Sequence, residues 1–362
     1  MIKINVLTNN GCPNSKAFNC PLLVSKKIFA EKGFKLNFNF KRDTEVLNAD
    51  CIFINSNVFR PYWKDSKKEI FSFLESARSL KVKTVWFDTT DSTWCTQFEV
   101  LPFVDKFLKS QIFADKNKYL ERFRTGRIFT DTFDSLYNAG EESSGYSLPE
   151  KEFLSKIDIS WNTCFENYTA SRFGIFSKIK QFLRPLAPSL TTGGKFNIDF
   201  IPPEKYRNMK ISCRTGLSHS RPSVVAHRRA IGEIMKEMGV EYGKISLPEY
   251  FHELENSQSA IGPFGVGEIT LRDYEIIICG AALLKPDMEH LRTWPELFAP
   301  GRTYIPFRWD LSDLKDKIKS LENADLCRET AKNAQNIYKD AVSGSGMEKF
   351  CERLLKITEL KS

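Results

Sequence analysis

The 362-residue sequence lacks long hydrophobic runs, and its first residues lack the features of a signal peptide. No stretch of about eighteen consecutive apolar residues occurs, although a transmembrane helix needs roughly that length. The first residues, MIKINVLTNN, lack the charged, apolar and small-residue zones of a secretory signal peptide. We therefore expect the chain to stay in the cytosol or at the cytosolic face of a membrane.

Cysteine pairs and metal-ligand spacings are absent as well. The nine cysteines are scattered singly from Cys12 to Cys351, with no CxxC pair and no zinc-type spacing to the four histidines. We expect reduced and mostly buried thiols and no metal site. His252 and His290 lack the neighbouring serine and carboxylate of a hydrolytic triad, so we interpret both as structural.

The composition is that of a globular protein with a basic balance. Hydrophobic residues make up 41% and charged residues 27% of the chain, and two domains of roughly 150–200 residues are expected at this length. The net charge of +8 favours an anionic partner such as a phosphate-bearing ligand, a lipid head group or a nucleic acid. Because the charge is spread evenly and no nucleic-acid-binding motif occurs, a nucleic acid is not expected.

One basic segment has helical periodicity. In FSKIKQFLRP, residues 176–185, apolar side chains recur at helical spacing among Lys178, Lys180 and Arg184. Such an amphipathic helix can lie on an anionic membrane, which would make the protein a peripheral membrane protein. The same pattern is also typical of a surface helix that packs on its own core.

The first half of the chain alternates strand and helix patterns. Short apolar runs at 3–8, 35–40, 49–55 and 82–90 are separated by helical patterns, which is typical of a parallel sheet with crossover helices. Ligands bind beyond the carboxyl ends of the strands in such sheets. The polar residues that follow those ends here are Asn9, Asn55, Asp88 and Asp91.

A turn-rich stretch separates this alternation from a second one. RPLAPSLTTGGK ends at residue 195, and we place the domain boundary between residues 192 and 193. The second half predicts a strand at 209–215 and a helix over 224–239. Another helix is predicted to begin at Ser246, because Glu249 three residues later completes a capping box.

The stretch GPFGVGEITLRDYEIIICG, residues 262–280, follows a short strand and has the form of a glycine loop and a helix. Gly265 and Gly267 let the backbone approach a ligand, and the helix N-terminus favours an anion, so we predict a phosphate site. The two glycines also match the start of the dinucleotide pattern GxGxxG, with Asp287 as the ribose ligand. The third glycine position holds Thr270, and an NAD-dependent oxidoreductase is retained as an alternative.

Arg272 and Glu275 lie three positions apart, so they share one side of the predicted helix. Glu275 can accept hydrogen bonds from ribose hydroxyls, and Arg272 can neutralise a diphosphate. The alternative interpretation is an ordinary surface ion pair between the two side chains.

Residues 261–310 resemble the C-terminal domain of GT-B glycosyltransferases, in particular the group 1-like bacterial enzymes of surface-glycan assembly. The resemblance rests on a glutamate five residues before a glycine, Glu275 to Gly280, followed by a small and apolar strand. It implies an α/β fold of two Rossmann-like domains facing a central cleft, with the acceptor bound by residues 1–192 and the nucleotide sugar by residues 193–362. It also implies that the last helix packs back on the first domain and that no metal ion or cofactor is needed.

Retaining members of this fold carry two glutamates separated by seven residues. That spacing falls on Gly267 here, and the nearest acid is Glu268. We therefore assign Glu275 to the ribose and keep Glu268 as a secondary donor-site candidate. Retaining and inverting transfer both stay open.

Two further groups of site residues follow from strand ends. The segment 212–223 fills the first strand-to-helix loop of the second domain, where GT-B enzymes contact the donor phosphates. Asp88 and Asp91 are candidates for the base that removes the acceptor proton, or both cap backbone N–H groups in a turn. The remaining predicted donor-site residues are Arg214, Thr215, Gly216, Arg221, Lys285 and Asp287.

The sequence thus predicts a glycosyltransferase that moves a sugar from a nucleotide-sugar donor to a hydroxyl acceptor, either a glycan or a lipid-linked saccharide. The alternatives are an NAD-dependent oxidoreductase and a non-catalytic module that binds anionic partners. The sugar, the nucleotide base, the acceptor and the linkage depend on the shape of the pocket, which no sequence spacing predicts.

Overall fold

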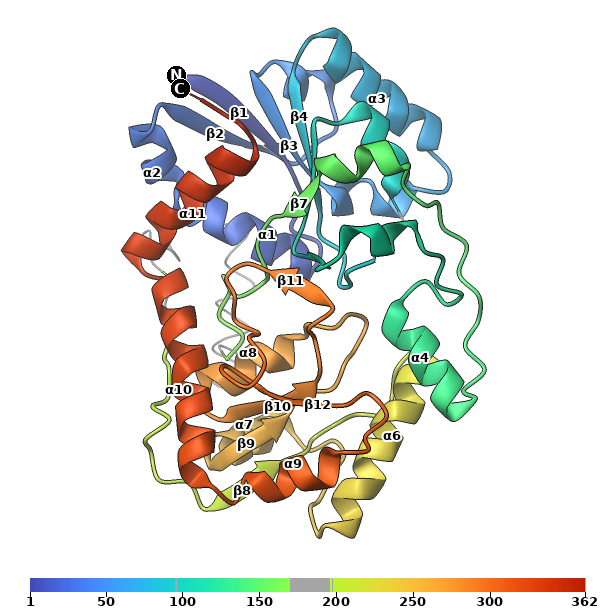
Figure 1. Ribbon diagram of the computed structural model, residues 1–362. Coiled ribbons are helices and arrows are strands. Elements are labelled where there is room, and N and C mark those ends of the chain that lie inside the picture. The colour runs from blue at the N-terminus through green and yellow to red at the C-terminus, as the bar shows by residue number, and fades with distance from the viewer. Residues whose placement is uncertain (95–96, 170–195, 197, 362) are drawn as a thin grey trace.

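The structure is a computed structural model that describes residues 1–94, 97–169, 196 and 198–361. Two parallel sheets with packed helices form the two halves of the molecule (Figure 1), which confirms the predicted α/β class. The predicted domain boundary and the basic segment 176–185 lie outside the described residues.

The first sheet has six parallel strands in the order β2-β1-β3-β4-β5-β7. These strands are β1 Ile2–Leu7, β2 Phe34–Asn39, β3 Cys51–Asn55, β4 Lys83–Asp88, β5 Lys106–Lys109 and β7 Ile157–Ile159. The α-helices of this half are α1 Pro13–Val24, α2 Lys26–Glu31, α3 Lys67–Ser79 and α4 Ile128–Tyr137. Short 3-10 helices are η1 Thr44–Leu47, η2 Ser56–Val58, η3 Arg60–Tyr62, η4 Phe98–Phe103, η5 Lys116–Leu120 and η6 Lys151–Lys156.

Both faces of this sheet are covered, which explains its apolar central strands. Side chains alternate between the two faces of a strand, so neighbouring residues enter different cores. Phe53 and Phe87 pack in the cluster that contains Phe18 of α1, whereas Ile54 and Trp86 pack in the cluster that includes α3. Polar loops follow the carboxyl ends of the strands.

The second sheet has four parallel strands in the order β12-β10-β9-β8. These strands are β8 Met209–Ser212, β9 Ser257–Ile261, β10 Ala282–Pro286 and β12 Ile305–Phe307. The helices of this half are α6 Pro222–Glu237, α7 Leu247–Glu255, α8 Leu271–Ile278, α9 Leu314–Ser320, α10 Ala324–Ala341 and α11 Gly344–Ile357. The predicted capping box at the start of α7 is present, and Gly280 ends α8 with a φ of +75°.

Three connections tie the halves together. Strand β6, Gln111–Phe113, pairs antiparallel with β11, Leu291–Thr293. Helix α4 packs against α6, and α11 runs back to α2, so the two chain ends lie close together (Figure 1). At that return, Arg353 of α11 donates a hydrogen bond of 2.7 Å to the Ser160 carbonyl oxygen. The second half is therefore held at both sides of the space between the sheets.

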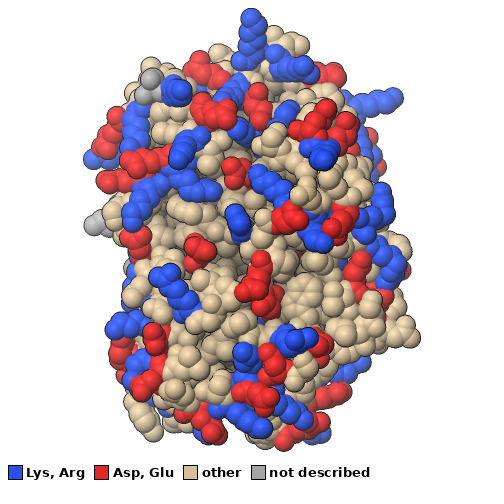
Figure 2. Space-filling view, in the orientation of Figure 1, with Lys and Arg blue, Asp and Glu red and all other residues tan. Residues whose placement is uncertain are grey.

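Two further expectations concern thiols and membrane spans. Six of the eight described cysteines are buried, as the sequence predicts. In the described part of the chain, no helix is both long enough and apolar enough to span a membrane. Basic and acidic side chains are interspersed over the face that Figure 2 shows, without a large patch of one sign.

Candidate functional site

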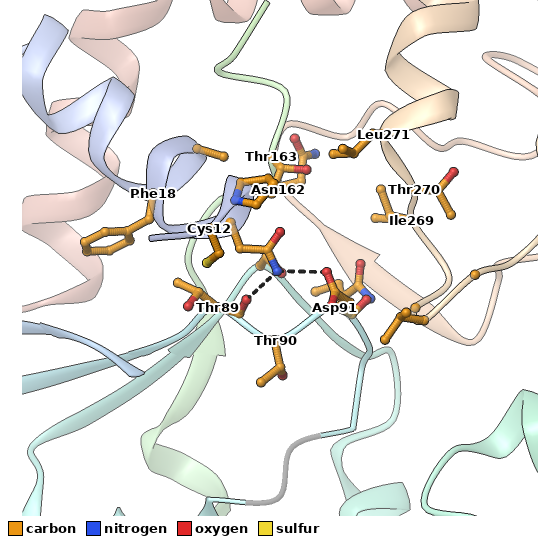
Figure 3. Close-up of a pocket in the computed structure, with 18 of the residues that line it drawn as sticks. Cys12, Phe18, Thr89, Thr90, Asp91, Asn162, Thr163, Ile269, Thr270 and Leu271 are labelled. Carbon is orange, nitrogen blue, oxygen red and sulfur yellow. Dashed lines mark hydrogen bonds between the residues drawn. The ribbon is translucent and has the colours of Figure 1, made fainter. Parts of the chain in front are cut away.

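A cavity of about 480 Å³ lies between the two halves. Its first-domain wall includes the start of α1 and the loop after β4, and its second-domain wall includes residues 265–267 and 269–271 and Tyr274 (Figure 3). Both walls therefore contain loops that follow the carboxyl ends of parallel strands, as expected for this class of sheet. The volume is within the usual range for a small-molecule site.

The first-domain wall is fixed by side-chain amides. Asn14, in the first turn of α1, donates to the Thr89 carbonyl oxygen at 2.9 Å and to Asp91 Oδ1 at 2.8 Å (Figure 3). The buried Asn55 at the end of β3 accepts from Thr89 Oγ1 at 2.8 Å and donates to Thr8. These bonds hold the 89–91 loop in one position against the cavity.

Asp88 and Asp91 both line the cavity, but their surroundings differ. Asp88 is 1% exposed, forms a buried ion pair with Lys109 and also accepts a bond from the Thr90 backbone N–H. Asp91 is only partly buried and is oriented by Asn14. A base must exchange a proton with a substrate, so Asp91 suits that role better than the ion-paired Asp88.

On the second-domain wall, Asp273 already caps the N-terminus of α8. Its carboxylate accepts from the Thr270 N–H at 2.7 Å, and it forms a buried pair with Lys285 whose Nζ–Oδ2 distance is 2.9 Å. Burial raises the pKa of Asp273 and lowers that of Lys285. The predicted phosphate position at this helix end is thus filled by a side chain, and Lys285 is structural rather than exposed to a ligand.

Two basic side chains supply the free donors on this wall. Arg228 of α6 lines the cavity and donates to the carbonyl oxygens of Phe264 and Gly216, and none of the described carboxylates forms an ion pair with it. Burial, and next Arg272, lower its pKa to about 10. His219 accepts from the Arg221 N–H through Nδ1 at 3.1 Å, which places its proton on Nε2. That Nε2 is buried without a partner among the described residues.

Gly267 and Glu268 join the two halves, and of the two only Gly267 also lines the cavity. A Cβ atom at Gly267 would overlap the Asp91 carbonyl oxygen and lie 3.0 Å from the Ser92 nitrogen. The fully buried Glu268 accepts from Thr93 Oγ1 at 2.5 Å and from Gln111 Nε2 at 3.0 Å. The predicted donor role of Glu268 does not fit this geometry, because first-domain donors occupy its carboxylate.

Replacing Glu268 by glutamine is expected to lower the free energy of unfolding by about 1–3 kcal/mol, because one buried donor loses its acceptor. Burial alone would raise the pKa of Glu268, but His290 and Thr93 lower it below the usual 4.5. The stabilisation is therefore complete above about pH 4.5 and is lost as the pH falls through the folded-state pKa. Urea unfolding of both proteins at several pH values measures this difference.

The matched control is Glu121→Gln, because Glu121 forms an exposed pair with Lys118. This variant is expected to unfold like the parent protein. Equal stability of the Glu268→Gln variant and the parent at neutral pH would contradict the structural role of Glu268.

Glu275 lies beyond the cavity lining, on α8. It accepts from Tyr250 Oη at 3.0 Å, and the Arg272 guanidinium lies 5.2 Å from the centroid of the Tyr250 ring. Burial raises the pKa of Glu275, and Arg272 opposes that shift. Tyr250, Arg272 and Glu275 therefore form one group near the start of α8, in which Glu275 is a hydrogen-bond acceptor and Arg272 is a cation. The ribose role of Glu275 and the phosphate role of Arg272 stay predictions.

The other predicted donor residues lie outside the cavity lining. Arg214 pairs with Glu253 and Glu241, and Arg221 pairs with Glu141, which also caps the N-terminus of α6. Asp287 accepts from the Glu289 N–H at 2.6 Å. Of the remaining predicted residues, Gly265 lines the cavity, whereas Thr215 is buried and Gly216 packs against Lys244.

Sequence reasoning missed several cavity residues. Asn14 and Arg60 each lie a few residues after a strand of the first sheet, and Arg228 lies in the second turn of α6. His219 is in the 212–223 loop, from which Arg214 and Arg221 were chosen instead. The position of these residues near strand ends could have indicated a place in the cavity. The sequence does not show which of the arginines forms an ion pair with a carboxylate.

No protein-family model and no curated protein match the chain. Among solved structures, it is similar to Anabaena Alr3699/HepE in complex with UDP-glucose, with 10% identity and a TM-score of 0.43 over 98% of this chain and 100% of that chain. It is also similar to a glycosyltransferase from Rickettsia africae ESF-5, with 9% identity and a TM-score of 0.42 over 99% of each chain. A third is T4 phage BGT in complex with its UDP-glucose substrate, with 12% identity and a TM-score of 0.41 over 99% of each chain.

The architecture rests on the chain's own arrangement, in which two parallel α/β halves face one cavity at the carboxyl ends of their strands. That arrangement is the GT-B fold.

Proposed function

We propose that this protein is a glycosyltransferase that uses a nucleotide-sugar donor. The observation that carries the proposal is that the two walls of the cavity present different chemical groups. Arg228, which has no carboxylate partner among the described residues, and the Nε2–H donor of His219 line the second-domain side, and a partly buried carboxylate, Asp91, lines the first-domain side. A diphosphate leaving group needs hydrogen-bond donors and positive charge, and a hydroxyl nucleophile needs a carboxylate that can accept its proton.

In this proposal the donor diphosphate binds to Arg228 and to the Nε2–H group of His219. Both groups line the second-domain side of the cavity, and Gly265 leaves space beside Arg228 because it has no side chain. The nucleoside extends along α8 toward Tyr250 and Glu275, whose carboxylate can accept bonds from ribose hydroxyls. In this proposal Arg228 and His219 stabilise the negative charge of the leaving diphosphate, and no metal ion is needed.

The reaction is a displacement at the anomeric carbon. The acceptor hydroxyl oxygen forms the new bond to that carbon, and its proton passes to Asp91. The bond from the anomeric carbon to the phosphate oxygen breaks, and the nucleoside diphosphate leaves with the electron pair. Asn14 keeps the Asp91 carboxylate turned into the cavity through its 2.8 Å hydrogen bond. The acceptor, a glycan or a lipid-linked saccharide, enters from the first-domain side.

The test is thermal unfolding in the presence of UDP, GDP, CMP, ADP, TDP and NAD(H). One nucleoside diphosphate at about a hundred times its dissociation constant is expected to stabilise the protein by about 2.7 kcal/mol. The matching nucleoside without phosphates is the control, and it is expected to stabilise less because Arg228 and His219 have nothing to bind. Stabilisation by NAD(H) alone, or by none of these compounds, would overturn the proposal.

A further inference from the structure

Strand β6 places one side chain between the two walls of the cavity. Gln111 begins β6, which pairs with β11 of the second half, and it lines the cavity although only 2% of it is exposed. Its amide nitrogen Nε2 donates to the Asp91 carbonyl oxygen at 2.8 Å and to Glu268 Oε2 at 3.0 Å. A primary amide has two N–H groups, so the Gln111 side chain can serve both acceptors and join the loop of Asp91 to the second half.

The second half also contacts the loop of Asp91 directly. Glu268 accepts hydrogen bonds from the N–H group of Thr93 at 3.1 Å and from its hydroxyl group at 2.5 Å, two residues after Asp91. The preceding Gly267 lies so close to the Asp91 carbonyl oxygen that a Cβ atom would overlap it. The main chain of this loop is therefore held by Gly267, by Glu268 and by the Gln111 bridge.

The side chain of Asp91 has a separate support. Asn14 of α1 donates to Asp91 Oδ1 at 2.8 Å, and both residues belong to the first half. This bond fixes the direction of the carboxylate whatever the position of the second half. The main-chain position of Asp91, in contrast, depends on Gly267 and Glu268, which belong to the second half. Different elements thus set the direction of the carboxylate and its distance from the second-domain wall.

We propose that Gln111 is a positioning residue through which contact between the two halves sets the place of Asp91. This inference rests on the proposed function, in which Asp91 is the base. When the second half moves away, Glu268 no longer orients the Gln111 amide, and the loop of Asp91 loses its contact with the second-domain wall. A displacement of about 1 Å in a reacting group can cost about 10²-fold in rate. Turnover is therefore confined to the arrangement in which the halves touch, and Gln111 acts through Asp91 rather than on a substrate.

The experiment follows release of the nucleoside diphosphate found in the thermal test from its glucose, galactose and N-acetylglucosamine conjugates, with water as the acceptor. The water oxygen bonds to the anomeric carbon, its proton passes to Asp91, and the nucleoside diphosphate leaves with the electron pair of the broken bond. Gln111→Met removes both N–H donors with little change in side-chain length. This variant is expected to lower the rate constant at saturating donor about 10- to 100-fold and to leave the dissociation constant of the nucleoside diphosphate unchanged.

Gln335→Met is the matched control. Gln335 is 1% exposed, and its amide also donates to backbone carbonyl oxygens, those of Ile201 at 2.8 Å and Ile277 at 2.9 Å. Both variants are expected to melt at a lower temperature than the parent protein, but only Gln111→Met should lose turnover. In an Asp91→Asn background, Gln111→Met should lower the rate less than about 2-fold further, because effects of residues that act through one another do not add.

Three outcomes would overturn the inference. The first is full turnover by Gln111→Met, and the second is an undiminished rate loss when this change is added to Asp91→Asn. The third is an equal rate loss in Gln335→Met, which would assign the effect to general destabilisation. If Gln111→Met does not fold, Gln111→Asn gives the same test, because its amide is too short to reach both acceptors. A parent protein that neither binds a nucleotide nor releases one would instead defeat the proposed function, and the inference with it.

Discussion

Replacing Asp91 by asparagine is expected to reduce kcat by about 10²- to 10⁴-fold, the usual contribution of a positioned general base. Asparagine has nearly the same shape and can still interact with Asn14, so the 89–91 loop should keep its position. Donor affinity should change little, because the proposed donor contacts belong to Arg228 and His219 on the other wall. Steady-state kinetics and nucleotide titration separate the two effects.

The comparison with Asp88→Asn makes this test specific. Asp88 is buried against Lys109, so its replacement leaves a buried ammonium group without its counter-charge. We expect that variant to lose stability, by about 3–5 kcal/mol, whereas Asp91→Asn should melt like the parent protein. Full turnover by Asp91→Asn would remove Asp91 from the mechanism.

Replacing Gly267 by alanine is expected to disrupt the domain contact. The new Cβ would overlap the Asp91 carbonyl oxygen, and backbone atoms cannot move aside as a flexible side chain can. Overpacking of this kind costs about 1–3 kcal/mol. The displaced 89–91 loop carries Asp91, and a shift of about 1 Å in a reacting group can cost about 10²-fold in rate. Denaturant unfolding and turnover measure the two losses.

Gly265→Ala is the matched control in the same loop. Its nearest neighbours would be side-chain atoms, Thr270 Cγ2 at 3.2 Å and an Arg228 nitrogen at 3.4 Å, which can give way slightly. This variant should therefore stay nearly as stable as the parent, with its main effect on donor binding. If Gly265→Ala proved as destabilising as Gly267→Ala, the close approach to Asp91 would not be the reason for the glycine.

Much of the fold could be predicted because its signals are local. The apolar runs at 49–55 and 82–90 became the buried central strands β3 and β4, and Ser246 and Glu249 formed the predicted capping box. Burial of a strand on both faces and capping of a helix end depend on residues that are close in sequence. The positions of the loops at strand ends followed from the same patterns.

The roles of charged residues could not be predicted in this way. Glu268 looked like a ligand for a sugar donor, but its partner Thr93 is 175 positions away in the sequence. Arg214 looked like a phosphate clamp, but Glu253 pairs with it. Whether a charge is free or neutralised depends on such distant partners, since a single opposite charge at contact distance changes what a group can bind.

The sequence alone determined the α/β class and the strand-end loops that line the cavity, including Asp91 and Gly265. Local apolar periodicity and turn chemistry specify those features. Only the tertiary structure decided that Gly267 and Glu268 join the domains and that, among the described residues, Arg228 has no carboxylate partner and His219 Nε2 has no hydrogen-bond partner. The physical reason is that electrostatic compensation and close backbone approach arise between segments that meet only after both domains have folded.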